Sequence, residues 1–130
     1  MIADTSFLVA LFIEEDELHE KSINELEKNK KEILITDRIL EETFTVICYK
    51  KGVDYALMIF EKLKNNKDII FYQLSEEEIK KIYEIIKKFR KKLSFADYTV
   101  IYLALKDNEK ILCFDEELNK TINYRRRIQD

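Results

Sequence analysis

The sequence predicts an α/β protein whose mostly parallel sheet is covered by helices on both faces. Short apolar segments alternate with longer amphipathic segments along the chain, and this alternation is typical of parallel sheets. The short segments predict strands at residues 2–3, 33–36, 69–72 and 111–114, with a weaker strand near the C-terminus. In such sheets, ligand sites lie outside the carboxyl ends of the strands.

The predicted helices are marked by their start and stop residues. They cover residues 18–29, 37–51, 54–65, 75–92, 94–108 and 116–120. Asp37 can cap the second of these helices, which ends before Gly52, the only glycine of the chain. Ser75 and Ser94 each stand three residues before an acid, and each is predicted to open a capping box.

Length and composition predict one domain over residues 1–130. Of the 130 residues, 46% are hydrophobic and 38% are charged, which suits a soluble domain with a sizeable core. The 23 Lys and Arg against 26 Asp and Glu give a formal charge of -3, so the overall charge does not indicate nucleic-acid binding. One glycine and no proline exclude the glycine-dependent phosphate loops and the nucleophile elbow of hydrolases.

Cysteine use and the N-terminus predict a cytoplasmic protein. Cys48 and Cys113 lie in apolar stretches, which favours reduced thiols over a disulfide. The sequence begins without a basic leader, and its apolar run at residues 7–13 is too short to span a bilayer. Because His19 is the only histidine and lies far in sequence from both cysteines, any metal is expected to be held by oxygen.

Four acidic residues stand where an apolar or turn residue would be more usual. Asp4 and Asp115 directly follow predicted strands, while Asp97 and Glu42 lie on the apolar faces of predicted helices. Each has a plainer interpretation: a helix cap for Asp4 and Asp115, a capping-box acid for Asp97, and a solvated surface residue for Glu42. Both interpretations can hold together for Asp97. The adjacent Glu41 falls on a different face of its helix.

These four acids could converge at one edge of the sheet. Converging carboxylates repel one another unless a cation lies between them. A few carboxylates with open coordination positions suit Mg²⁺ or Mn²⁺, and such an ion can lower the pKa of a bound water and promote phosphodiester hydrolysis. The pattern therefore predicts hydrolysis that needs a metal and no histidine base.

The order and spacing of the acidic segments resemble those of the PIN-domain ribonucleases, in particular the small single-domain toxins of the VapC type. The similar segments are residues 1–6, 36–43, 94–97 and 113–115, which span the chain. The sequence departs from the family at Cys113, where Thr or Ser is common, and at Leu118, where an aromatic residue is common.

The resemblance implies a three-layer α/β/α sandwich and a metal-dependent ribonuclease. Asp4, Glu42, Asp97 and Asp115 would bind Mg²⁺ or Mn²⁺ and serve catalysis, with Ser6 supporting the site by hydrogen bonding. The resemblance also implies an RNA substrate, a homodimer, and a cognate antitoxin of a type II toxin-antitoxin pair.

Basic residues outside the acidic segments are candidate RNA contacts. They are Arg38, Lys50, Lys51, Arg125, Arg126 and Arg127. Neutralising four carboxylates with metal would move the formal charge from -3 to about +1, which permits RNA binding. A solvated tail explains the C-terminal arginines equally well. Tyr49, Tyr98 and Tyr102 are interpreted as core aromatics rather than as base-stacking platforms.

Two other functions fit the same pattern. One is a non-catalytic PIN-like binding module whose acidic pocket holds a basic peptide. The other is a PIN nuclease of RNA processing or decay that has no antitoxin. A metal titration separates catalysis from the binding module, because an ion that binds the native state must raise its stability.

Overall fold

The computed structural model describes residues 1–129, with side chains through Arg125. Its strands are β1 (Ile2–Ala3), β2 (Ile33–Thr36), β3 (Ile69–Tyr72) and β4 (Ile111–Leu112). Its helices are α1 (Thr5–Phe12), α2 (His19–Lys28), α3 (Asp37–Lys51), α4 (Val53–Asn65), α5 (Glu76–Phe89), α6 (Phe95–Asp107) and α7 (Glu116–Gln129). Among residues 1–129, no helix combines the length and the apolar character needed to cross a bilayer.

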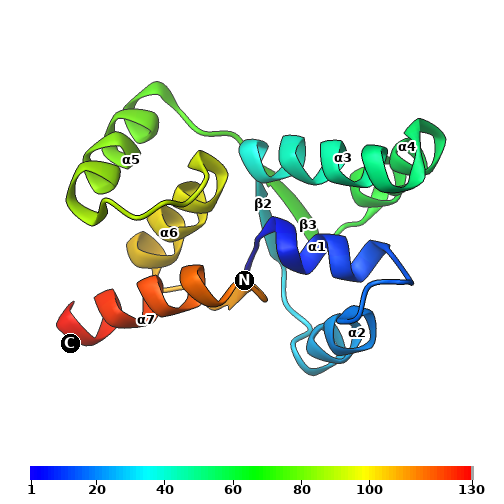
Figure 1. Cartoon of the computed structure of the whole chain (residues 1–130), viewed down its shortest axis with the longest axis horizontal. Helices are drawn as coiled ribbons and strands as arrows, with labels where there is room; N and C mark the ends of the chain where they lie inside the picture. The colour runs from blue at the N-terminus through cyan, green and yellow to red at the C-terminus, as the bar shows by residue number, and fades with distance from the viewer. Residues whose placement is uncertain (130) are drawn as a thin grey trace.

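The four strands form one sheet in the order β3-β2-β1-β4, and all three pairings are parallel. Figure 1 shows α1 to α4 on one side of this sheet and α5 to α7 on the other. The predicted α/β class and layered sandwich are confirmed. One edge of β1 pairs with β2, and the other edge pairs with β4, which comes last in the chain. The strand order therefore reverses beside β1. Ligands bind at such switch points in open α/β sheets.

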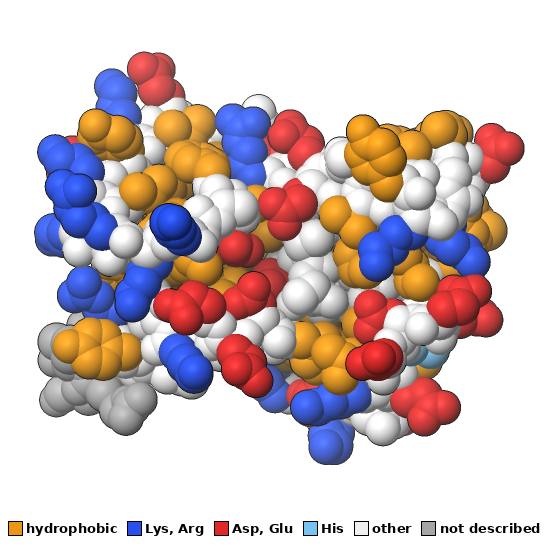
Figure 2. Space-filling model, viewed as in Figure 1, with side chains coloured by type: hydrophobic (Ala, Val, Ile, Leu, Met, Phe, Trp, Pro, Cys, Tyr) orange, Lys and Arg blue, Asp and Glu red, His pale blue; other side chains and the backbone are white. Residues whose placement is uncertain are grey.

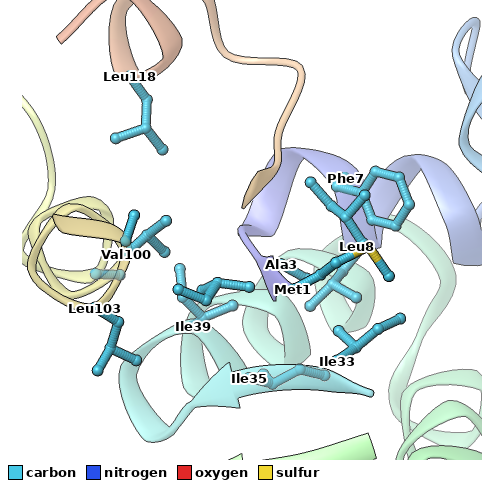
Figure 3. Close-up of a cluster of buried hydrophobic side chains, with 14 of the residues drawn as sticks. Met1, Ala3, Phe7, Leu8, Ile33, Ile35, Ile39, Val100, Leu103 and Leu118 are labelled. Carbon is cyan, nitrogen blue, oxygen red and sulfur yellow. The ribbon is translucent and has the colours of Figure 1, made fainter. Parts of the chain in front are cut away.

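The hydrophobic core lies between the sheet and the two helical layers. In Figure 3, Phe7 and Leu8 of α1 lie on one side of Ala3, and Val100 and Leu103 of α6 lie on the other. All five side chains are at most 1% exposed. Burying an aliphatic or aromatic side chain of this size contributes about 1.5–3 kcal/mol. The two layers therefore clamp the short β1, whose carboxyl end leads into Asp4.

The C-terminal quarter differs from the prediction. The weaker strand is wrong, because the predicted short helix at 116–120 continues as α7 to Gln129. Leu118 and Ile122 are fully buried one helical turn apart, so the apolar spacing here is helical. The strand predicted at 111–114 ends at Leu112, since the amide of Phe114 donates to the Ser6 hydroxyl rather than to a neighbouring strand.

Two local assignments also need correction. Asp37 does not cap α3, because the Thr36 hydroxyl accepts from the Ile39 amide at 3.1 Å and takes that role. Tyr49 is not a core aromatic: its side chain is 88% exposed, whereas Tyr98 and Tyr102 are buried as predicted. Tyr49 lies in the last turn of α3, two residues before its end at Lys51.

Candidate active site

Asp4 is the most deeply placed carboxylate at the carboxyl edge of the sheet. It is 1% exposed and caps α1, with Oδ1 accepting from the Phe7 amide at 3.1 Å and from the Ser6 hydroxyl at 2.8 Å. Its Oδ2 accepts from the Cys113 thiol at 3.0 Å. Burial raises the pKa of Asp4 to about 6 against the lowering effect of these hydrogen bonds, and the charge of Asp97 raises it further. Asp4 thus both caps α1 and belongs to the acidic cluster.

Asp97 combines a local role with a place in the same cluster. It completes a capping box: its backbone amide donates to the Ser94 hydroxyl at 3.0 Å, and its Oδ2 accepts from the Ser94 amide at 3.3 Å. Burial raises the pKa of Asp97, and so do the charges of Glu42 and Asp115. The carboxylate therefore helps to start α6 while it faces two other acids.

The adjacent glutamates of α3 are distinguished by their surroundings. Glu42 is half-buried, and its charge acts on Asp97. Glu41 is exposed and pairs with Arg38 at 3.6 Å on the outer face of the helix. Glu42, and not Glu41, is therefore the glutamate whose charge acts on the acidic cluster.

Asp115 and Cys113 join the end of β4 to the end of β1. Asp115 accepts from the Leu118 amide at 3.0 Å and so caps α7. The Cys113 sulfur accepts from the Asp115 amide at 3.2 Å while its thiol donates to Asp4. Burial, and then the charge of Asp4, raise the pKa of Cys113, which keeps it a protonated donor. Cys48 and Cys113 are both free thiols, as predicted, although each is only half-buried.

The four predicted acids interact through their charges but do not form a ready metal site. Asp97 interacts with Asp4, Glu42 and Asp115 through their charges. Figure 2 shows acidic side chains gathered near the centre of one face, between the α5–α7 side and the α1–α3 side. Within the part of the chain that the structure describes, no three His, Cys, Asp or Glu side chains already form a group that could hold a metal ion.

The donor chemistry of this cluster nevertheless fits a hard cation. All four side chains supply carboxylate oxygens, which Mg²⁺ and Mn²⁺ prefer. Burial and mutual repulsion make charge on Asp4 and Asp97 costly, and a cation among them would relieve that cost and draw the carboxylates closer.

Sequence reasoning missed a buried hydroxyl pair below the site. Thr36 and Thr99 are both 0% exposed, and their hydroxyl oxygens lie 2.9 Å apart. Thr99 donates to the Ala96 carbonyl, so Thr36 supplies the proton between the two hydroxyls. This link fixes the start of α3 against the start of α6, the two helices that carry Glu42 and Asp97. The available signal was polar residues at otherwise apolar positions beside the acidic segments.

The predicted RNA contacts lie in three different places. Arg38 is one turn before Glu42, whereas Lys50 and Lys51 are at the far end of α3, where Lys51 pairs with Glu15 at 3.0 Å. The structure therefore does not bring those two lysines to the acidic cluster. Arg125 lies on α7 over the Phe89 ring. The side chains of Arg126 and Arg127 lie outside the described residues.

The fold and the strand-end acids define a doubly wound α/β protein with an acidic site at its switch point. Residues 1–123 match the model of the PIN domain, and the chain belongs to the PIN domain family. The structure is similar to that of VapC20 from Mycobacterium tuberculosis, described as a sarcin-ricin loop cleaving toxin, with a TM-score of 0.82 and 17% sequence identity. The match covers 92% of this chain and 93% of that chain. No curated protein sequence matches the chain significantly.

Proposed function

We propose that this protein is a metal-dependent endoribonuclease, the toxin of a type II toxin-antitoxin pair. Membership of the PIN domain family supports a nuclease in general. The observation that carries the proposal is the acidic cluster, in which Asp97 interacts with Asp4, Glu42 and Asp115 at the carboxyl edge of the sheet. The fold similarity to a sarcin-ricin loop cleaving toxin supports RNA as the substrate.

Asp4, Glu42, Asp97 and Asp115 would hold one or more Mg²⁺ or Mn²⁺ ions. When bound, such an ion lowers the pKa of an attacking water and offsets the charge that develops on the phosphate. The protein's own contribution is to orient these carboxylates before RNA arrives. Ser6 and the Phe7 amide fix one oxygen of Asp4, the thiol of Cys113 contacts the other, and the Ser94 box fixes Asp97.

The proposal extends to partners and setting. A toxin of this type would act in the cytoplasm as a homodimer and would be neutralised by a cognate antitoxin that covers the acidic site. Arg38 is the predicted RNA contact nearest to the acids along α3, since it precedes Glu42 by one helical turn. It would contact phosphate beside the cleaved bond.

The direct test is cleavage of labelled RNA by wild type and Asp97→Asn in Mg²⁺, in Mn²⁺ and in EDTA. Asparagine retains an oxygen that can accept from the Ser94 amide, so the fold is expected to persist while the charge is lost. We expect metal-dependent cleavage by wild type alone. Glu78→Gln is the matched control, because Glu78 holds the same position in the capping box of α5. Equal cleavage by wild type and Asp97→Asn would overturn the proposal.

A further inference from the structure

A hollow lies between the end of α5 and α7. This cavity, here called the α5–α7 cleft, has a volume of about 480 Å³ and is lined by Phe89, Lys91, Glu117, Lys120, Tyr124 and Arg125. Two segments lead from it to the acids. The loop after α5 runs from Lys91 into the Ser94 box, and α7 starts at Asp115, which caps it. At about 1.5 Å per residue, Tyr124 is roughly 14 Å along α7 from Asp115.

The charge of the α5–α7 cleft is opposite to that of the whole chain. Three cations, Lys91, Lys120 and Arg125, face one carboxylate, Glu117. Glu117 pairs with Lys91 at 3.7 Å, but both side chains are more than half exposed, so the pair is weak and easily exchanged for a phosphate. Figure 2 shows the lysine and arginine side chains crowded on the α5 side of the molecule, next to the central acids.

The aromatic residues of the α5–α7 cleft suit a nucleobase. The guanidinium of Arg125 lies 4.1 Å from the centroid of the Phe89 ring, so a planar cation is held against one wall. Tyr124 is 59% exposed and borders the same hollow. An exposed aromatic ring among cations is the arrangement by which proteins stack unpaired bases while they neutralise the backbone.

A comparison within the molecule shows which part of this arrangement is specific. Tyr83 of α5 is 60% exposed and lines another hollow with Lys80 and Lys81, but Glu77 and Glu84 balance those two lysines. That hollow has the aromatic ring and the lysines without a net positive charge. The α5–α7 cleft combines the aromatic ring, the lysines and a net positive charge with a direct chain connection to Asp97 and Asp115.

We infer that the α5–α7 cleft binds single-stranded RNA next to the bond that is cut, with a base stacked on Tyr124 and phosphates held by Lys120 and Arg125. This inference rests on the proposed ribonuclease function and assigns the segment of substrate that flanks the reacting phosphate. An unpaired strand is required, because bases in a duplex are not free to stack on a protein ring.

The test measures binding separately from cleavage. In an Asp97→Asn background, fluorescence anisotropy measures the affinity of the full chain for a labelled oligouridylate of about 12 nucleotides. Tyr124→Ala is expected to weaken binding about 10-fold, while the matched variant Tyr83→Ala leaves it unchanged. Lys120→Gln is expected to reduce the slope of log affinity against log salt by about 1, and Lys80→Gln is its control.

The outcomes separate this inference from the proposed function. Loss of affinity in Tyr124→Ala supports the cleft even if wild type cuts none of the RNAs offered. In the cleaving protein, the same substitution should raise KM and leave kcat unchanged. Equal affinities of Tyr124→Ala and Tyr83→Ala, with native circular dichroism in both, would overturn the cleft as an RNA site. Binding of a poly-glutamate peptide in place of the oligonucleotide would overturn it as well.

Discussion

The capping boxes at the starts of α5 and α6 share one local arrangement. In each, a serine hydroxyl accepts from the amide three residues on, and the acid at that position accepts from the serine amide. Glu78 of the first box also accepts from the Tyr72 hydroxyl at 2.5 Å and lies 3.9 Å from the Lys106 ammonium. Asp97 of the second box instead faces Glu42 and Asp115.

These different neighbours shift the pKa values of the two acids in opposite directions. Burial pushes the pKa of Glu78 upward, but hydrogen bonds from Tyr72 and from Ser75 lower it overall. Burial also pushes the pKa of Asp97 upward, and there the neighbouring charges add to the rise. A capping motif therefore fixes where a helix starts, whereas the fold decides whether its acid is structural or available to a cation.

The comparison between a structural acid and an acid of the cluster can be tested on the adjacent glutamates of α3, where we expect the largest effect on RNA cleavage. Glu42→Gln should reduce RNA cleavage by about 100- to 1,000-fold, because it removes one carboxylate from the acidic cluster. Glu41→Gln should leave cleavage within about twofold, because Glu41 is exposed and contacts Arg38. Single-turnover rates with saturating Mg²⁺ measure both. Loss of activity in Glu41→Gln instead would reverse the assignment.

A second test uses the stability of the metal-free protein. The folded-state pKa of Asp4 is about 6 against an ordinary value of 3.8. Folding therefore favours the protonated acid, and this stability is present below pH 3.8 and is lost as pH rises through about 6. Asp4→Asn should stabilise the protein by about 3 kcal/mol at about pH 8 and give no such gain at about pH 4.

Urea unfolding in EDTA at the two pH values measures this difference. Asp54→Asn is the control, because Asp54 is an exposed acid in the first turn of α4 and its replacement should change stability by less than about 0.5 kcal/mol. A destabilised Asp4→Asn at the higher pH would show that the hydrogen bonds to Asp4 outweigh its burial.

Much of the fold could be predicted because its signals are local. The apolar runs of β2 and β3, the two serine boxes and the glycine after α3 each act within a few residues, and each was assigned correctly. Parallel pairing followed from the alternation of strands and helices. Two errors arose where distant contacts decide: Ser6 ends β4 through its bond to Phe114, and the core buries one face of α7. The misplaced cap of α3 was a local error, because Thr36 and Asp37 are adjacent and both can cap a helix.

The candidate site was predictable as a set of residues and not as a set of contacts. The order of Asp4, Glu42, Asp97 and Asp115 along the chain indicated convergence at the strand ends. The thiol link from Cys113 to Asp4 joins residues 109 positions apart. The hydroxyl link between Thr36 and Thr99 spans 63 positions. Polar residues at apolar positions mark the two threonines as unusual, but nothing local in the sequence pairs them with each other or pairs Cys113 with Asp4, because a side-chain hydrogen bond between distant residues leaves no periodicity.

A metal titration gives the next largest expected effect. At about 100 times its Kd, Mg²⁺ should stabilise wild type by about 2.7 kcal/mol. Asp97→Asn should lose most of this gain, whereas Glu78→Gln should keep it, because Glu78 has a tyrosine and a lysine in place of other acids. Thermal unfolding with and without Mg²⁺ measures the difference. The same gain in Asp97→Asn as in wild type would place the cation elsewhere.

The smallest expected effect compares the two serines. Ser75→Ala and Ser94→Ala each remove a hydroxyl that accepts from a helix amide, so each should cost about 1 kcal/mol of stability in urea unfolding. Their effects on cleavage should differ. Ser94→Ala frees the first turn of α6, which positions Asp97, and should slow single-turnover cleavage about 10-fold, while Ser75→Ala should not. Equal cleavage by both variants at matched stability would mean that Asp97 is held by its neighbours across the sheet rather than by its own capping box.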